Sequence, residues 1–400
     1  MSDNPYIKPL KGFNPKNNLV VNEKFRFHAS GAAGDTLSDL EGNYDSEVTG
    51  DSGKEQYTYK TSDAIVSSII AVTTGSDKKV LIVSNKAGEI VILSPQSNEL
   101  RPVKKIQLTG SIVHRPSYYN GILYCSTKEG MLYAIDSGLT GSDWERTRIE
   151  TIWQQNLKKG VHTAPVATGK ILLVAALDSI HIFEAYYQDN TNKAIGKHLN
   201  RHMIEGGVVS SPNVDHGVIY IGSESNTLYA LEYGGRSLTE IWSYKATGRI
   251  RVKPMVSTAS GAVIFGTTNG HIYCVDSRKG DYKWSFITKA PCMSNVVSAK
   301  ISNAEYYFFG ADNGIFYCLN SQGKKMWEFK TRGKIRTEAL VHNGRVYFGS
   351  GDNHFYALDI KTGKKLFVYA TDGNINGKPL LLDDVIYFGS TDSFVHGIHT

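Results

Sequence analysis

One sequence pattern recurs eight times between residue 57 and residue 400, and it limits the possible folds more than any other feature. Each copy holds a short apolar run such as VYFG, a turn of small and polar residues, and a second run such as FYAL. Most copies add a later run with an aromatic residue, and the copies begin 40–49 residues apart. Four strands in a unit of this length are typical of a propeller blade. The sequence therefore predicts an all-β fold, an eight-bladed β-propeller of four-stranded antiparallel blades.

The copy that begins at Gly333 shows most clearly where the strands and turns of one blade are expected. Asn343-Gly344 and Gly351-Asp352-Asn353 accept the positive φ angles of tight hairpins. Lys361-Thr362-Gly363-Lys364 has the look of a phosphate loop, but it lacks the upstream Gly and joins two strands where a helix would be needed. We therefore interpret it as a turn. The predicted strands of this blade are 335–341, 345–350, 354–358 and 365–370.

The last copy has three strands before Thr400, so its fourth strand must come from elsewhere in the chain. The segment KEQYTYK (54–60) stands directly before the first copy, as KMWEFK (325–330) stands before the copy at Ile335. We expect the strand at 55–60 to pair with the C-terminal strands and close the ring, which removes an open sheet edge. FRFHAS (25–30) is a rival closing strand.

Residues 1–54 repeat nothing and form a predicted N-terminal extension, which leaves 55–400 as the propeller domain. The stretch 35–51 is polar and acidic, a composition that stays loose unless a partner orders it. Its carboxylates do not match the spacing of a calcium-binding EF-hand loop. We interpret it as a solvated linker. Its acidic residues are Asp35, Asp39, Glu41, Asp45, Glu47 and Asp51.

Composition narrows the class of protein. A formal net charge of +6 is too mild to indicate nucleic-acid binding. The N-terminus has no apolar core of a signal peptide, and no apolar run approaches the about 18 residues of a membrane span. Four cysteines without a CxxC pair favour buried thiols in a reducing compartment over a metal or redox site. The sequence thus predicts a cytoplasmic protein without a cofactor or metal.

The repeated unit reads Ile-x-Ser-Ser-Pro, then Val-Tyr-x-Gly-Ser-x-Asp, Leu-Tyr-Ala-Leu-Asp, Thr-Gly-Lys and Trp-x-Phe. It resembles the pyrroloquinoline-quinone-type propeller repeat over 57–400, most closely at 206–276 and 333–398. The resemblance implies an eight-bladed propeller. It implies less about activity, because some members are quinoprotein dehydrogenases and others, similar to the outer-membrane β-barrel assembly lipoprotein, are docking platforms.

The dehydrogenase members hold their quinone between a tryptophan and a pair of adjacent cysteines, beside a calcium ion. This chain has no adjacent cysteines and is shorter than those enzymes. The resemblance is therefore closer to the docking members. It implies a non-catalytic protein-interaction scaffold. The alternatives are a structural subunit of a larger assembly, or an enzyme with its site in the propeller channel such as a diverged quinoprotein.

The turns related to the pattern Gly-Ser-x-Asp/Asn, at 222–225, 310–313, 349–352 and 389–392, resemble a repeated acidic site. Asp and Asn cap turns through their own backbone, and a device of the fold should occur in every blade. His396 and His399 stand three apart on a predicted strand and so point to opposite faces. We assign neither set to catalysis or metal binding.

The predicted first strands, which line the channel of a propeller, carry cations at alternate positions. Side chains of one parity share a face, so these cations would converge near the axis and oppose Glu338 alone. Like charges at such a place favour an anion or an acidic peptide. The alternative is a set of solvated strand ends, and the acidic 35–51 stretch could fold back on this mouth. The predicted partner-binding residues of the channel mouth are Arg115, His162, Arg251, Lys253, Arg336 and Lys378.

The longest predicted loops are 138–150 and 186–203, and loops on a rigid scaffold often carry recognition. They supply a second set of predicted contacts to a protein partner: Trp144, Arg146, Tyr186 and Tyr187.

Overall fold

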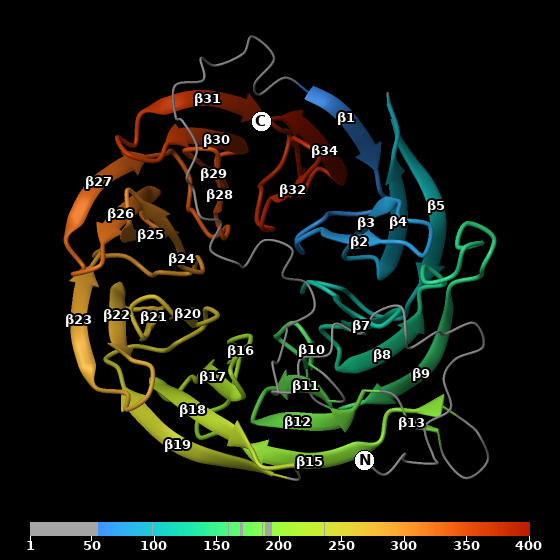
Figure 1. Ribbon diagram of the computed structural model, residues 1–400, viewed down its shortest axis with the longest axis horizontal. Coiled ribbons are helices and arrows are strands. Elements are labelled where there is room, and N and C mark those ends of the chain that lie inside the picture. The colour runs from blue at the N-terminus through green and yellow to red at the C-terminus, as the bar shows by residue number, and fades with distance from the viewer. Residues whose placement is uncertain are drawn as a thin grey trace.

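The computed structural model describes residues 55–97, 99–158, 160–168, 171–185, 187–188, 194–235 and 237–400. These residues form eight four-stranded antiparallel sheets arranged as blades around a central axis (Figure 1). The all-β, eight-bladed propeller predicted from the repeat is confirmed.

In each of blades 1 to 7 the strands follow in chain order from the innermost to the outermost. Blades 1 and 2 contain β2 (Ile70–Thr73), β3 (Lys79–Ser84), β4 (Glu89–Pro95), β5 (Leu100–Gln107), β6 (Ser117–Tyr119), β7 (Ile122–Ser126), β8 (Met131–Asp136) and β9 (Glu150–Asn156). Blades 3 and 4 contain β10 (Val166–Thr168), β11 (Ile171–Ala176), β12 (Ser179–Glu184), β15 (His198–Met203), β16 (Asn213–Asp215), β17 (Val218–Gly222), β18 (Thr227–Tyr233) and β19 (Leu238–Lys245). A small hairpin, β13 (Tyr187–Gln188) with β14 (Ala194–Ile195), precedes β15.

The later blades are the most regular. Blades 5 and 6 contain β20 (Met255–Ser257), β21 (Ala262–Gly266), β22 (His271–Asp276), β23 (Tyr282–Ile287), β24 (Val297–Ile301), β25 (Ala304–Gly310), β26 (Ile315–Asn320) and β27 (Lys325–Lys330). Blades 7 and 8 contain β28 (Leu340–His342), β29 (Arg345–Gly349), β30 (His354–Asp359), β31 (Lys365–Ala370), β32 (Leu380–Leu382), β33 (Val385–Gly389), β34 (Phe394–His399) and β1 (Glu55–Lys60).

The ring is closed by the strand at 55–60, as predicted from the sequence. β1 pairs with β34, with Tyr57 opposite Gly397 and Lys60 opposite Phe394, so the N-terminal strand completes blade 8. In Figure 1 the blue β1 lies beside the dark red β34. The rival strand 25–30 lies outside the described residues.

The innermost strands are shorter than predicted. In blade 7 the strand is Leu340–His342, and 335–339 is an irregular link from blade 6. The link is held by its neighbours: the amide of Ile335 donates to the carbonyl of Ala311 at 3.2 Å, in a turn of blade 6. The Ile335 side chain fills the space over Gly310, where an added Cβ would lie 2.2 Å from its Cγ2. Contacts with blade 6 therefore take the place of pairing within blade 7.

The core lies between neighbouring blades. Phe316 of blade 6 stacks on Phe348 of blade 7 with ring centroids 4.0 Å apart, and Phe355 of blade 7 stacks on Phe388 of blade 8 at 4.2 Å. Because each sheet buries both faces against its neighbours, its two central strands read as continuous apolar runs, not as alternating ones.

In blades 4 to 6 a tryptophan on the outermost strand joins the blade to the next one. Trp284 of blade 5 donates from Nε1 to the carbonyl of Ser321 at 2.9 Å, and its ring lies against Gly323 in a turn of blade 6. Gly323 has φ of 75° and leaves room for the indole. We call this place the docking position. The strand registers put these residues there in blades 1 to 8: Lys104, Trp153, Asn200, Trp242, Trp284, Trp327, Phe367 and Tyr57.

Candidate functional site: the axial ring and the connection face

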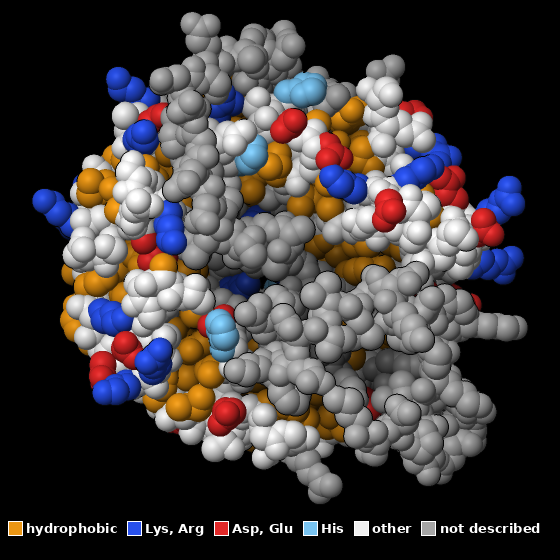
Figure 2. Space-filling model, viewed as in Figure 1, with side chains coloured by type: hydrophobic (Ala, Val, Ile, Leu, Met, Phe, Trp, Pro, Cys, Tyr) orange, Lys and Arg blue, Asp and Glu red, His pale blue; other side chains and the backbone are white. Residues whose placement is uncertain are grey.

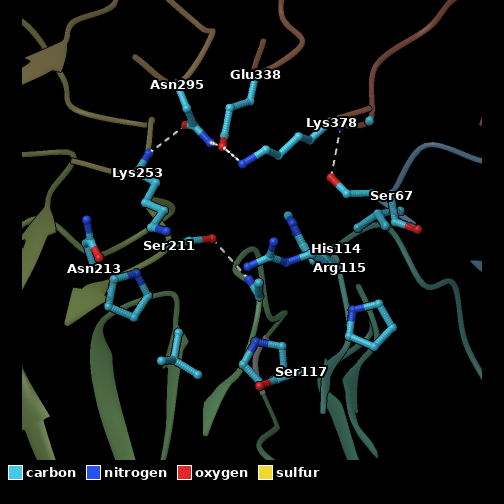
Figure 3. Close-up of a pocket in the computed structure, with 18 of the residues that line it drawn as sticks. Ser67, His114, Arg115, Ser117, Ser211, Asn213, Lys253, Asn295, Glu338 and Lys378 are labelled. Atoms are coloured by element: carbon cyan, nitrogen blue, oxygen red, sulfur yellow. Dashed lines mark hydrogen bonds and ion pairs between the residues drawn. The ribbon is translucent and has the colours of Figure 1, made fainter. Parts of the chain in front are cut away.

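The links that enter the eight innermost strands also build the channel. The fourth residue of each link lines a cavity of about 220 Å³ on the propeller axis (Figure 3). We call these eight equivalent residues the axial ring. They are Ser68, Arg115, Ala164, Ser211, Lys253, Asn295, Glu338 and Lys378.

Hydrogen bonds join one half of the axial ring from blade to blade. The amide of Lys253 donates to Asn295 Oδ1 at 2.9 Å, and Asn295 Nδ2 donates to Glu338 Oε2 at 2.7 Å. The other oxygen of Glu338 pairs with Lys378 Nζ at 2.7 Å, and the amide of Lys378 donates to Ser68 Oγ at 3.0 Å. The only carboxylate of the ring is therefore engaged from both sides.

The axial ring carries an excess of positive charge. Its ionised members are Arg115, Lys253 and Lys378 against Glu338, which gives a formal charge of +3 − 1 = +2. Among the described residues, no carboxylate pairs with the guanidinium of Arg115. Within the described part of the chain, Arg115 thus differs from Lys378, whose ammonium pairs with Glu338.

The remaining predicted cations of the channel mouth do not line the cavity. Arg251 makes a two-pronged contact with Glu224, with both nitrogen–oxygen distances at 2.7 Å. Arg336 does the same with Asp312, at 2.9 and 2.7 Å. The hydrogen bond to the carboxylate raises the pKa of each guanidinium. The prediction of one converging cluster is corrected: Arg251, Arg336 and His162, each the second residue of its link, do not line the cavity. In blades 5 and 7 this residue pairs with a turn of the preceding blade.

These paired arginines lie on the face formed by the links together with the turns between the second and third strands. We call it the connection face. It has an open apolar depression between blades 3 and 4, lined by Leu177, Asp178 and 203–207. Leu177 is 44% exposed and Met203 is 58% exposed. In the view of Figure 2, charged side chains of both signs are interspersed around the rim of the propeller.

Sequence reasoning missed this depression, although a signal was present. In blade 3 the turn between β11 and β12 is reduced to two residues, Leu177-Asp178, because Ala176 pairs with Ser179. The corresponding turns of the other blades are longer and made of polar or small residues, as at 350–353. An apolar residue in a turn that is polar in every other copy marks a surface that the fold alone does not explain.

The predicted loop contacts differ in their exposure to solvent. Trp144 is 1% exposed and donates from Nε1 to Ser76 Oγ at 2.8 Å, so it is a core residue and its prediction as a partner contact is wrong. Arg146 is exposed on the same loop and stays a prediction. Tyr186 and the side chain of Tyr187 lie outside the described residues. The loop predicted at 186–203 contains β15, the outermost strand of blade 3.

The turns between the second and third strands stabilise the fold, as the one at Gly349–Asp352 shows. Asp352 accepts hydrogen bonds from the amide of Arg332 at 2.9 Å and from the hydroxyl of Tyr356 at 2.8 Å, which fixes the turn against the link. All four cysteines are buried free thiols, and burial raises the pKa of Cys274, Cys292 and Cys318 to about 12. In the part of the chain that the structure describes, no three His, Cys, Asp or Glu side chains gather as metal ligands would. The same part holds no helix long and apolar enough to cross a membrane.

The sequence of this chain is similar to sequences of known proteins. The family model described as "Outer membrane protein assembly factor BamB" matches residues 150–304 and 298–400. The protein of that name from Nitrosomonas eutropha is 26% identical over 253 residues, which cover 60% of this chain and 57% of the relative. The one from Yersinia pestis is 27% identical over 195 residues, covering 44% and 47%. The chain thus spans about half the length of the curated relatives it matches.

Solved structures share the fold. The BamB of Moraxella catarrhalis has a TM-score of 0.66 at 16% identity and covers 87% of this chain and 99% of its own. Sqt1 of Saccharomyces cerevisiae has a TM-score of 0.71 at 10% identity, with 87% and 99% covered. A europium-containing methanol dehydrogenase reaches 0.64 at 14% identity, with 84% and 85% covered. A protein named as an assembly factor and one named as a dehydrogenase share this architecture, so the fold alone does not decide activity.

Proposed function

We propose that the propeller of this chain is a non-catalytic scaffold for protein interaction, because the chain belongs to the family described as outer membrane protein assembly factor BamB. The observation that carries the proposal is the apolar depression of the connection face. Exposed apolar side chains that lie together and are bordered by charge mark protein contacts more often than isolated ones do. Leu177 and Met203 lie together there, with Asp178 and Glu205 beside them.

The chemistry of the depression suggests the kind of partner. An apolar side chain would displace water from Leu177 and Met203, and a neighbouring Lys or Arg would meet Glu205, which is exposed. Asp178 already pairs with Arg201 at 3.1 Å and so serves more to hold the rim. We propose a protein segment that presents a large apolar residue next to a basic one.

An acidic peptide, predicted for the channel mouth, is the less supported partner. Three of the six predicted cations line the axial cavity, and two of the others already pair with Glu224 and Asp312. The cavity of about 220 Å³ holds only a few side-chain atoms. Such a peptide would therefore have to bind mainly outside the channel.

The absence of catalysis is also a proposal. It is supported by buried acids that serve the fold: Glu305 accepts hydrogen bonds from Ser257 at 2.6 and 2.8 Å and from the Tyr307 hydroxyl at 2.9 Å. The rival reading, a diverged quinoprotein, predicts a new absorbance band when the purified protein is mixed with the quinone and Ca²⁺. We expect none.

The test of the scaffold uses a variant and a matched control. Leu177→Asp with Met203→Asp places two charges in the depression, at positions exposed enough to tolerate them; the φ of 34° at Leu177 also suits Asp. The control, Tyr282→Ser, removes an apolar residue that is 57% exposed on the outer strand of blade 5. We expect a partner captured from the native source by the wild type and the control to be lost from the double variant, and calorimetry with that purified partner to agree. A partner retained equally by all three would contradict the proposal.

A structural subunit of a larger assembly is the second candidate function, favoured by the word "assembly" in the name of the relatives. It predicts that the native protein elutes at the mass of a stable complex at every concentration tested. A scaffold with an exchangeable partner would dissociate on dilution. For its location we propose the cytoplasm, which four buried free thiols support, and cell fractionation tests this against the outer membrane named for the relatives.

A further inference from the structure

We infer that three basic turns, on the face opposite the connection face, dock the acidic stretch 35–51 of the same chain. The turns join the third and fourth strands of blades 5, 6 and 7, at 277–281, 321–324 and 360–364. Together with the first residue of the strand that follows, each contains at least two exposed Lys or Arg side chains. The corresponding turn of blade 1, at 96–99, contains none, so the fold does not require cations at this place.

Five cations of the basic turns have no carboxylate partner in the described part of the chain. They are Arg278, Lys279, Lys324, Lys364 and Lys365. Asp276, beside the turn of blade 5, pairs with Lys283 at 3.3 Å. Asp359, beside the turn of blade 7, accepts a hydrogen bond from the hydroxyl of Thr362 at 2.6 Å. Asp281 is exposed and pairs with none of the five. The basic turns thus keep positive charge that attracts an acidic segment.

The start of β1 brings the acidic stretch next to these turns. Lys60, from which the first link leaves, pairs with Phe394 at the connection face. Glu55 pairs with Ile398 at the other end of the same two strands. In blade 7 the turn 360–364 occupies that end. The chain before Glu55 therefore leaves blade 8 at the place that a basic turn has in the neighbouring blade.

The length of the segment suits the distance to all three turns. Asp51 stands four residues before Glu55 and Asp35 twenty, which an extended chain spans over about 14 and 70 Å. A domain of the size of 55–400 is about 50 Å across, so the outer strands of neighbouring blades lie about 20 Å apart. In Figure 1, β31, β27 and β23 follow β1 in this order around the rim. The stretch is therefore long enough to reach blade 5.

The composition of the stretch suits the charge of the turns. Residues 35–51 contain six carboxylates at intervals of two or four residues and no Lys, Arg or His. A single exposed ion pair is weak. A segment tethered beside its binding surface is present there at an effective concentration on the order of mM, so several weak pairs together can hold it.

The channel mouth, the other surface to which the sequence allowed this stretch to fold, is less accessible to it. The axial ring is built by the links, and the links belong to the connection face. A chain that leaves blade 8 on the opposite face would have to cross the rim before it reached the channel. The basic turns need no such crossing.

The experiment that locates the stretch is cross-linking of the full chain with a carbodiimide, which joins a carboxylate to a lysine amine in direct contact. Mass spectrometry identifies the linked residues, and mixing protein with a heavy-isotope-labelled copy separates links within one chain from links between two. We expect links within one chain from the acids of 35–51 to lysines of the basic turns. Links only between chains, links to the lysines of the axial ring in their place, or no link to the basic turns would overturn the proposal.

A triple variant and a matched triple control test whether charge drives the docking. The variant removes one cation from each basic turn, and the control removes three exposed cations from the connection face, so both have the same net charge. Thermal melting checks that both are folded. The variant is Lys279→Gln, Lys324→Gln and Lys364→Gln. The control is Lys86→Gln, Lys128→Gln and Lys289→Gln.

The readout is the rate at which glutamyl endopeptidase cleaves after Glu41 and Glu47, relative to a free peptide of the same sequence. We expect cleavage about fivefold faster in the variant than in the wild type, and a change within about twofold in the control. Because ~1 M salt shortens the screening length to about 3 Å, it should bring the wild type to the rate of the variant. Equal rates in all three proteins at low salt would overturn the proposal. None of these outcomes bears on the apolar depression, so the scaffold proposal is tested separately.

Discussion

A tryptophan makes the contact from blade 5 to blade 6 and also the contact from blade 2 to blade 3, but the two indole N–H groups differ in their hydrogen bonding. Trp284 donates its Nε1 to Ser321 and packs against Gly323 in a short turn. Trp153 packs against Gly196 and Phe183, and its buried Nε1 has no hydrogen-bond partner among the described residues. In blade 3 the segment with the β13–β14 hairpin replaces the short turn whose carbonyl would accept that bond.

The difference separates blades that keep the contact between neighbours from a blade that departs from it. Blades 4 to 6 keep the tryptophan, the turn glycine of the next blade and the hydrogen bond between them, so they hold the ring. Blade 3 departs from the pattern at its docking position, where Asn200 stands, and in its turn at Leu177. The blade that departs from the repeat at these two places is thus also the one whose short turn lines the apolar depression.

The largest expected effect concerns the glycine of the regular contact. Gly323→Ala would add a Cβ 2.5 Å from the Trp284 ring at a φ of 75°. Strain and overpacking together should lower the free energy of unfolding by about 3 kcal/mol. Urea unfolding followed by tryptophan fluorescence measures it.

Gly235→Ala is the matched control in the corresponding turn of blade 4. Gly235 also has a positive φ, of 85°, but an added Cβ meets nothing within 4 Å. We expect a loss of about 1 kcal/mol from strain alone. Equal losses at the two glycines would show that the contact with Trp284 does not lock the blades.

The next effect concerns Lys104, the docking residue of blade 1. Its Nζ donates to the carbonyls of Ser137 and Gly138 at 3.2 and 2.9 Å, where Trp242 uses an indole on the carbonyl of Ser277. Burial lowers the pKa of Lys104 to about 8, and the nearby Asp136 opposes this shift. The docking position thus accepts a cation at the cost of desolvation.

This cost should appear as a pH dependence. Between the folded pKa near 8 and the unfolded value near 10.5, the unfolded chain binds more protons, so stability rises with pH. Lys104→Met lacks this group. We expect the stability of the wild type, relative to the variant, to rise by up to about 3 kcal/mol from pH 8 to 10.5. Parallel stability curves over that interval would refute the burial of a charged Lys104.

The sequence predicted the architecture because the signals for it are local and repeated. A glycine at the end of the second strand of a blade, such as Gly389, leaves room for the isoleucine of the next link, here Ile65 across the ring closure. The site was predicted only in part. Arg115, Lys253 and Lys378 meet at the axis, but Arg251 and Arg336 do not, because the links are not strands and alternation does not decide their side-chain directions. Which acids lie within reach of an arginine depends on neighbouring blades, and sequence spacing does not show that.

The smallest expected effect returns to the two tryptophans. Phe removes the indole N–H at either place and leaves an aromatic ring. Trp284→Phe leaves the carbonyl of Ser321 without its donor, whereas Trp153→Phe removes a buried N–H that had no acceptor. A buried polar group without a partner costs about 1–3 kcal/mol, so Trp153→Phe should be the milder change by about 1–2 kcal/mol. Urea unfolding of both variants measures the difference. If Trp153→Phe proved as costly as Trp284→Phe, its Nε1 would have to be satisfied in solution, and the contact between blades 2 and 3 would be as complete as that between blades 5 and 6.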